Sequence, residues 1–137
     1  MPIFVGKDFN DDVDSIVEFD EMYGGAGNDY LRAAKPGEVH LWGGSGDDYL
    51  RANIVPGTSA IAFGGDGNDA VLGSLDGAVG KNALYGGAGD DALYLIVGTA
   101  DGGPGRDWVT GTRFSDVLYG GMGTSPVHRS LGCPSVR

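Results

Sequence analysis

The sequence predicts an all-β domain, a right-handed parallel β-roll of about five coils. A nine-residue motif recurs five times at similar spacing, which is typical of stacked repeats. Glycine contributes 27 of the 137 residues, and among the 19 acidic residues only Glu18, Glu21 and Glu38 are glutamates. A chain rich in Gly and Asp turns often and contains little helix. Short stretches beside each motif alternate apolar and polar residues, as strands with one buried face do.

The motif reads G-G-x-G-x-D-x-u-x, where u is an apolar residue. Its copies are GGAGNDYLR from Gly24, GGSGDDYLR from Gly43, GGDGNDAVL from Gly64, GGAGDDALY from Gly86 and GGPGRDWVT from Gly102. A sixth copy begins at Gly120 and fails at Ser125, which stands where the Asp should be. Successive starts lie 19, 21, 22, 16 and 18 residues apart. Two nine-residue half-turns make one coil of about this length, so the motif returns to the same edge of the roll in every coil.

The strands follow from the same alignment. We expect the core to consist of the u residues and of the residues two places before each glycine pair, which are Leu31, Leu50, Val71, Leu93, Val109, Leu41, Ala62, Leu84, Ala100 and Leu118. The half-turns between motifs, such as AAKPGEVHLW and NIVPGTSAIAF, have lost the glycine pattern, and GTRFSD from Gly111 is a degraded copy. The sequence therefore predicts one edge that can bind metal and one plain edge.

Composition and motif chemistry point to a cation. The net charge of −10 argues against nucleic acid and anionic membrane surfaces as partners, and no apolar run is long enough to span a membrane. Glycine allows backbone angles closed to other residues, so that carbonyl groups can turn toward a shared point, and Asp adds a short carboxylate. Ca²⁺ takes six to eight such oxygens. One loop offers too few, whereas two loops stacked one coil apart offer enough.

From Gly24 to Gly123 the chain resembles the RTX, or haemolysin-type, calcium-binding repeats, whose fold is a serralysin-like parallel β-roll. The resemblance implies Ca²⁺ between successive loops, held by two Asp carboxylates and by carbonyl groups of both loops. The Asp pairs would be Asp29 with Asp48, Asp48 with Asp69, Asp69 with Asp91, and Asp91 with Asp107. The carbonyl donors would be Gly24, Gly43, Gly64, Gly86 and Gly102 at the first motif position, and Gly25, Gly44, Gly65, Gly87 and Gly103 at the second.

The function we expect is Ca²⁺-dependent folding of a module in a secreted RTX-type protein. Two alternatives remain open: a non-catalytic accessory module of a secreted protease, lipase or alginate epimerase, and a Ca²⁺-dependent adhesive or structural protein. The chain has no H-E-x-x-H, G-x-S-x-G or P-loop motif, so we expect no enzymatic activity of its own. The N-terminus lacks the features of a cleavable signal, which favours type I-like export.

Aromatic residues precede most glycine pairs, namely Tyr23, Trp42, Phe63, Tyr85 and Tyr119, with Asp101 as the exception. Alternation places them on the outer face. We expect a ladder of rings stacking between coils, although a sugar- or partner-binding stripe would use the same residues. His40 is expected on the surface of a strand.

The two ends of the sequence differ from the repeat. Residues 1–23 are expected to form degenerate capping half-turns, 24–123 the roll, and 124–137 an irregular tail that contains the single cysteine, Cys133. The segment Asp8–Asp14 resembles the start of an EF-hand loop, but Val13 replaces the required glycine and Phe19 the bidentate Glu. The abrupt end of the repeat suggests a truncated or frame-altered C-terminus. Its uncapped edge would favour self-association.

Overall fold

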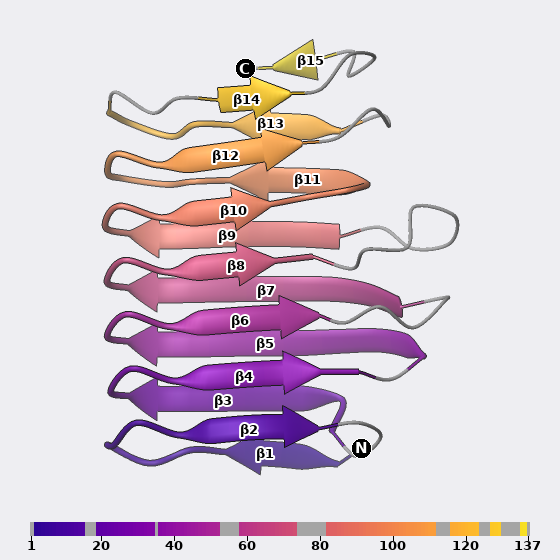
Figure 1. Ribbon diagram of the computed structural model, residues 1–137, viewed down its shortest axis with the longest axis vertical. Coiled ribbons are helices and arrows are strands. Elements are labelled where there is room, and N and C mark those ends of the chain that lie inside the picture. The colour runs from indigo at the N-terminus through magenta and orange to yellow at the C-terminus, as the bar shows by residue number, and fades with distance from the viewer. Residues whose placement is uncertain are drawn as a thin grey trace.

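The computed structural model describes residues 2–15, 19–34, 36–52, 58–73, 82–111, 116–123, 127–129 and 135–136. The chain winds as a stack of coils, and each coil contributes one strand to each of two parallel sheets (Figure 1). This arrangement confirms the all-β parallel roll predicted from the sequence. Within the described residues, no helix is long and apolar enough to cross a membrane.

The two sheets take alternate strands of the chain. The odd sheet contains β1 (Ile3–Val5), β3 (Glu21–Ala26), β5 (Gly37–Ser45), β7 (Thr58–Asp66), β9 (Asn82–Ala88), β11 (Gly98–Asp101), β13 (Val117–Tyr119) and β15 (Ser135–Val136). The even sheet contains β2 (Asp12–Ser15), β4 (Tyr30–Ala33), β6 (Tyr49–Ala52), β8 (Ala70–Leu72), β10 (Ala92–Tyr94), β12 (Trp108–Gly111) and β14 (Val127–Arg129). Each strand pairs in parallel with the strand one coil away, so neighbours in space are two elements apart in sequence.

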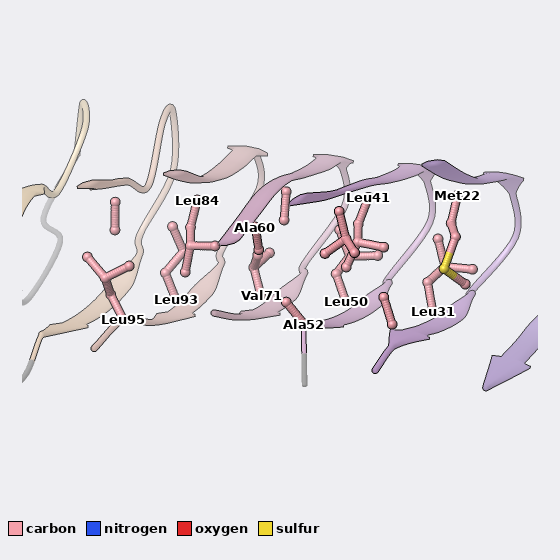
Figure 2. Close-up of a cluster of buried hydrophobic side chains, with 14 of the residues drawn as sticks. Met22, Leu31, Leu41, Leu50, Ala52, Ala60, Val71, Leu84, Leu93 and Leu95 are labelled. Carbon is pink, nitrogen blue, oxygen red and sulfur yellow. The ribbon is translucent and has the colours of Figure 1, made fainter. Parts of the chain in front are cut away.

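A narrow apolar core lies between the two sheets (Figure 2). All ten residues predicted from the motif alignment are buried, with at most 1% of their surface exposed. Each short strand contributes only one or two of these side chains, so no strand has a core until its neighbours stack on it. Val39 and Leu95 are also fully buried, although the motif alignment did not single them out, and so is Met22, which stands two places before the first glycine pair but was left out of the predicted set.

Registration between coils holds even though the coils differ in length. In the even sheet Leu31 aligns with Leu50, Leu50 with Val71, and Val71 with Leu93. The length differences fall on the edge where an even strand leads into the next odd strand, at the right in Figure 1. The opposite edge is uniform, because it carries the motif.

Four of the five predicted rings stack along the outer face of the odd sheet, whereas the fifth, Tyr119, aligns with Asp101 instead of a ring. The ring centroids lie 4.3 Å apart for Tyr23 and Trp42, 6.0 Å for Trp42 and Phe63, and 4.7 Å for Phe63 and Tyr85, with nearly parallel planes. The even sheet has a shorter stack of Tyr30 on Tyr49, at 5.1 Å. Such cross-strand pairs contribute roughly 0.2–1 kcal/mol each, so the rings add to the stability of the stacked coils but are too weak to determine the fold.

The C-terminal segment is more regular than the irregular tail expected for 124–137. Its described residues form β14, which pairs with β12, and β15, which pairs with β13. Parallel pairing needs only backbone groups in extended conformation, and the preceding coil presents a free edge for it. These strands could not be predicted from the repeat, because the nonapeptide pattern ends before them.

Two glycines provide a matched test of how closely the coils approach. Gly44 (φ +119°) and Gly37 (φ +102°) both have positive φ, but a Cβ at Gly44 would collide with the carbonyl oxygen of Gly25, whereas a Cβ at Gly37 would meet nothing within 4 Å. We expect Gly37→Ala to lower the free energy of unfolding by about 1–3 kcal/mol through backbone strain alone. Gly44→Ala should lower it further. Equal losses in chemical denaturation would contradict the close approach at Gly44.

Candidate functional site

The uniform edge of the roll, at the left in Figure 1, is the place where each odd strand turns into the next even strand, and we call it the rim. The five motif copies form five rim loops, stacked one per coil. Each loop is tied to the next by its backbone: the N–H of Gly27 donates to the carbonyl of Ser45 at 2.9 Å, and Gly46 donates likewise to Asp66 at 2.8 Å. The same bond repeats at Gly67, Gly89 and Gly105.

The sixth-position aspartates form a single column along the rim. Asp29, Asp48, Asp69, Asp91 and Asp107 are at most 3% exposed. One oxygen of each carboxylate, Oδ1, accepts a hydrogen bond from the backbone N–H of the aspartate one coil earlier. The distances are 2.8 Å from Asp29 to Asp48, 2.8 Å from Asp48 to Asp69, 2.8 Å from Asp69 to Asp91 and 3.0 Å from Asp91 to Asp107.

The second oxygen of these carboxylates is in a different situation. Among the described residues, Oδ2 of Asp29, Asp48, Asp69 and Asp91 is buried and has no hydrogen-bond partner. A buried polar atom without a partner costs about 1–3 kcal/mol, and a charged one more. Four such atoms at equivalent positions of successive loops indicate that the rim is built around a group that compensates them.

The first glycine of each loop shows which other atoms surround these oxygens. A Cβ placed on Gly43 would collide both with Oδ2 of Asp48 in its own loop and with the carbonyl oxygen of Gly64 in the next loop, the latter at 2.5 Å. The same pair of obstacles, carboxylate and carbonyl, meets a Cβ at Gly24, Gly64 and Gly86. Two acceptor oxygens from adjacent coils therefore lie close to one small space, and while the carboxylate is ionised neither can donate a hydrogen bond to the other.

Burial raises the pKa of the carboxyl groups in this column. It raises the pKa of Asp48 to about 6, that of Asp69 to about 7 and that of Asp91 to about 6, and it raises the pKa of Asp29 as well. The hydrogen bond from the neighbouring backbone lowers each pKa, and the charges of adjacent aspartates raise it, but loss of solvation is the largest effect. The site is therefore costly to ionise unless a positive charge is present.

The donor set suits a hard cation with many oxygen ligands. In the part of the chain that the structure describes, no group of three or more His, Cys, Asp or Glu side chains could hold a metal ion. A metal site on this rim would therefore combine carboxylates with backbone carbonyl groups. Ca²⁺ accepts such mixed oxygen sets, whereas Zn²⁺ prefers nitrogen and sulfur.

Comparison with protein-family models agrees with this chemistry. The model of the RTX calcium-binding nonapeptide repeat matches four copies, over residues 18–35, 33–54, 74–95 and 101–124, which together cover more than half of the chain. The chain belongs to the RTX calcium-binding repeat family. Ca²⁺ is accordingly the ion of its repeats. No curated protein and no solved structure matches the sequence.

The RTX repeat is more extensive in the structure than in the family match. The copy from Gly64 lies outside the matched ranges, yet its loop stacks in register between its neighbours, with Gly65 aligned to Gly44 on one side and to Gly87 on the other. All five predicted aspartates lie in the one column. The incomplete copy from Gly120 follows the backbone path as far as Met122, which bridges to Pro104. Ser125 lies outside the described residues.

A second ladder of side chains on the RTX rim was missed from the sequence. The fifth-position residue of each loop donates its N–H to Oδ1 of the fifth-position residue one coil earlier: Asp47 donates to Asn28 at 2.9 Å, Asn68 to Asp47 at 2.8 Å, and Asp90 to Asn68 at 2.8 Å. The ladder ends at Arg106, which donates to Asp90 at 2.9 Å but has no side-chain acceptor. The signal was present, because four copies have Asn or Asp at a position written as x.

The raised pKa values predict an unusual pH dependence without metal. Since the folded roll holds protons on Asp48, Asp69 and Asp91 more tightly than the unfolded chain does, protonation stabilises it. In chelator this stabilisation should be complete below about pH 4, the ordinary range of Asp, and should be lost as the pH rises to about 7. Far-UV circular dichroism in chelator across this range measures it. Stability that increases with pH would contradict the prediction.

Proposed function

We propose that the chain is a Ca²⁺-dependent folding module in which each ion is held between two successive rim loops. The observation that carries this proposal is the series of four buried Oδ2 atoms without partners, on Asp29, Asp48, Asp69 and Asp91. Each lies, together with the first-position carbonyl oxygen of the next loop, close to where a Cβ on the first glycine of its own loop would stand. A cation bound there would give Oδ2 the partner that it lacks among the described residues.

The residues that would hold the ions come from both loops of a pair. The Asp pairs are Asp29 with Asp48, Asp48 with Asp69, Asp69 with Asp91, and Asp91 with Asp107. The carbonyl groups of the first and second motif glycines would complete each site, which are Gly24, Gly25, Gly43, Gly44, Gly64, Gly65, Gly86, Gly87, Gly102 and Gly103. Each central aspartate would serve two ions, so neighbouring sites would be coupled through it.

The energetic consequence would be folding on binding. Without metal, like charges are stacked at the spacing of adjacent strands, about 4.8 Å, and the glycines of the rim lose much conformational entropy when ordered. When bound, Ca²⁺ supplies the positive charge that makes the carboxylate column favourable. The chain's own residues supply the geometry of the site, since the backbone hydrogen bonds between loops fix their spacing and the apolar core excludes water behind them. The free energy of binding would then become free energy of folding.

We further propose that the module belongs to a secreted protein and is itself not catalytic. RTX repeats are typical of secreted proteins, and the family match supports this placement. Sites made of carbonyl groups and shared carboxylates suit the millimolar Ca²⁺ outside cells, where extracellular modules bind with dissociation constants of about 10⁻⁴–10⁻³ M. Low Ca²⁺ inside the cell would keep the chain unfolded until export.

Circular dichroism during a Ca²⁺ titration tests the folding proposal. In chelator at neutral pH we expect a spectrum dominated by disordered chain, and at about millimolar Ca²⁺ a β-rich spectrum. Mg²⁺ at the same concentration should be far less effective, because it demands a compact octahedral site and gives up water reluctantly. A β-rich spectrum in chelator at neutral pH, unchanged by Ca²⁺, would refute Ca²⁺-dependent folding.

Calorimetry of Asp69→Asn tests the sharing of carboxylates. The substitution keeps an oxygen that can accept the N–H of Asp48, but it removes the charge from two proposed sites. We expect two ions to bind more weakly. Asp66→Asn is the matched control, because Asp66 is an exposed carboxylate of the same loop outside the column. It should leave the number of bound ions unchanged. Loss of one ion or none in Asp69→Asn would contradict the shared arrangement.

A further inference from the structure

The N-terminal segment Gly6–Asp14 lies in the structure as one more rim loop. Its strand β2 pairs with β4, so that Val13 aligns with Leu31. The N–H of Asp11 donates to Oδ1 of Asp29 at 2.7 Å, and the N–H of Asn28 donates to Oδ1 of Asn10 at 2.9 Å. Both ladders of the rim therefore continue into this segment, although the family match begins only at residue 18. Within residues 1–23, which were expected to cap the roll, Gly6–Asp14 is thus the loop that stacks on the first motif copy.

Aligned with the motif, the sequence GKDFNDDVD keeps Gly6 at the first position, Asp11 at the sixth and Val13 at the eighth. The second and fourth positions differ, since Lys7 and Phe9 replace the glycines. In the next loop those glycines, Gly25 and Gly27, have φ of +114° and +115°, whereas no described residue other than glycine has a positive φ. The backbone at Lys7 and Phe9 must therefore run differently.

This difference changes the partner of the carboxylate. The N–H of Lys7 donates to Oδ2 of Asp11 at 2.8 Å. In the loops of Asp29, Asp48, Asp69 and Asp91 the equivalent Oδ2 has no such partner. Asp11 is also only half-buried, so that solvent reduces the cost of its charge. The N-terminal loop thus compensates its own carboxylate with a backbone amide.

We propose that the amide of Lys7 takes the role that Ca²⁺ has in the other loops, so that the Asp11–Asp29 pair is a latent cation site held closed and the ion array begins at Asp29–Asp48. This inference rests on the proposed function, because it assumes ions between the later loops. It assigns to Gly6–Asp14 the role of a metal-free cap. The cap continues the stacking of the rim by hydrogen bonds while it ends the row of bound ions.

The proposal predicts that glycine at two positions opens the latent site. Lys7 is exposed and Phe9 is 74% exposed, so replacing both side chains disturbs no core contact. The variant Lys7→Gly/Phe9→Gly restores the full motif and should bind one more Ca²⁺ per chain than the unaltered protein. Lys7→Ala/Phe9→Ala is the matched control, because it removes the same side chains without allowing positive φ. It should bind the same number as the unaltered protein.

Counting Ca²⁺ per chain by equilibrium dialysis and elemental analysis, at saturating Ca²⁺ and with folding checked by circular dichroism, gives the result. In the unaltered protein, Asp11→Asn should leave the number of bound Ca²⁺ ions per chain unchanged. In the double-glycine variant, the same substitution should abolish the additional ion. Loss of one ion in Asp11→Asn alone would overturn the proposal, because the loop would then already bind metal. No gain in a folded double-glycine variant would overturn it too. Neither result affects the outcome expected for Asp69→Asn, which tests the later sites separately.

Discussion

The rest of the structure depends on how the roll compensates five buried carboxylates stacked one coil apart on a single rim. Each has one oxygen bonded to the backbone of its neighbour, and four have a second oxygen with no partner in the described chain. Burial and, to a smaller extent, repulsion from neighbouring aspartates raise the pKa values of Asp29, Asp48, Asp69 and Asp91, most at Asp69. Hydrogen bonds satisfy half of this column. The other half has no partner among the described residues, and under the proposed function a cation would supply it, so that the residues that define the fold would also bind the ion.

Two hydrogen-bond ladders join successive loops of the rim. In the sixth-position ladder the N–H of Asp29 donates forward to Asp48, whereas in the fifth-position ladder Asp47 donates back to Asn28. The fifth-position side chains are exposed and include neutral Asn as well as Asp, so solvent reduces the cost of any charge in this ladder. The sixth-position carboxylates are buried, and four of them keep one oxygen without a hydrogen-bond partner among the described residues. A loop such as Gly6–Asp11 can consequently stack on its neighbour through hydrogen bonds alone.

The sequence was sufficient for the features that every copy repeats. Leu31 and Leu50 recur at one motif position, so their burial followed from the alignment, and the column of aspartates followed from the sixth position. The features missed from the sequence are those at motif positions where the residue type varies between copies. Asn28, Asp47 and Arg106 share a position but not a charge, and only hydrogen-bond geometry reveals the ladder. Likewise, the first loop does not match a pattern that requires glycine, because Lys7 and Phe9 stand at two of the glycine positions.

The contrast between the two edges follows from where register is fixed. Rim loops are tied to one another at every coil, so strands enter the even sheet in register whatever the chain does elsewhere. The opposite edge can then change in length, and the motif starts vary from 16 to 22 residues apart without disturbing the core. At that edge, individual side-chain hydrogen bonds replace the repeated backbone bonds of the rim. The side chain of Asn82 donates to the carbonyl of Val97 at 3.1 Å, and Asp116 accepts the N–H of Gly98 at 3.2 Å. One regular edge is enough to align both sheets, because each coil is short and its two strands cannot shift independently.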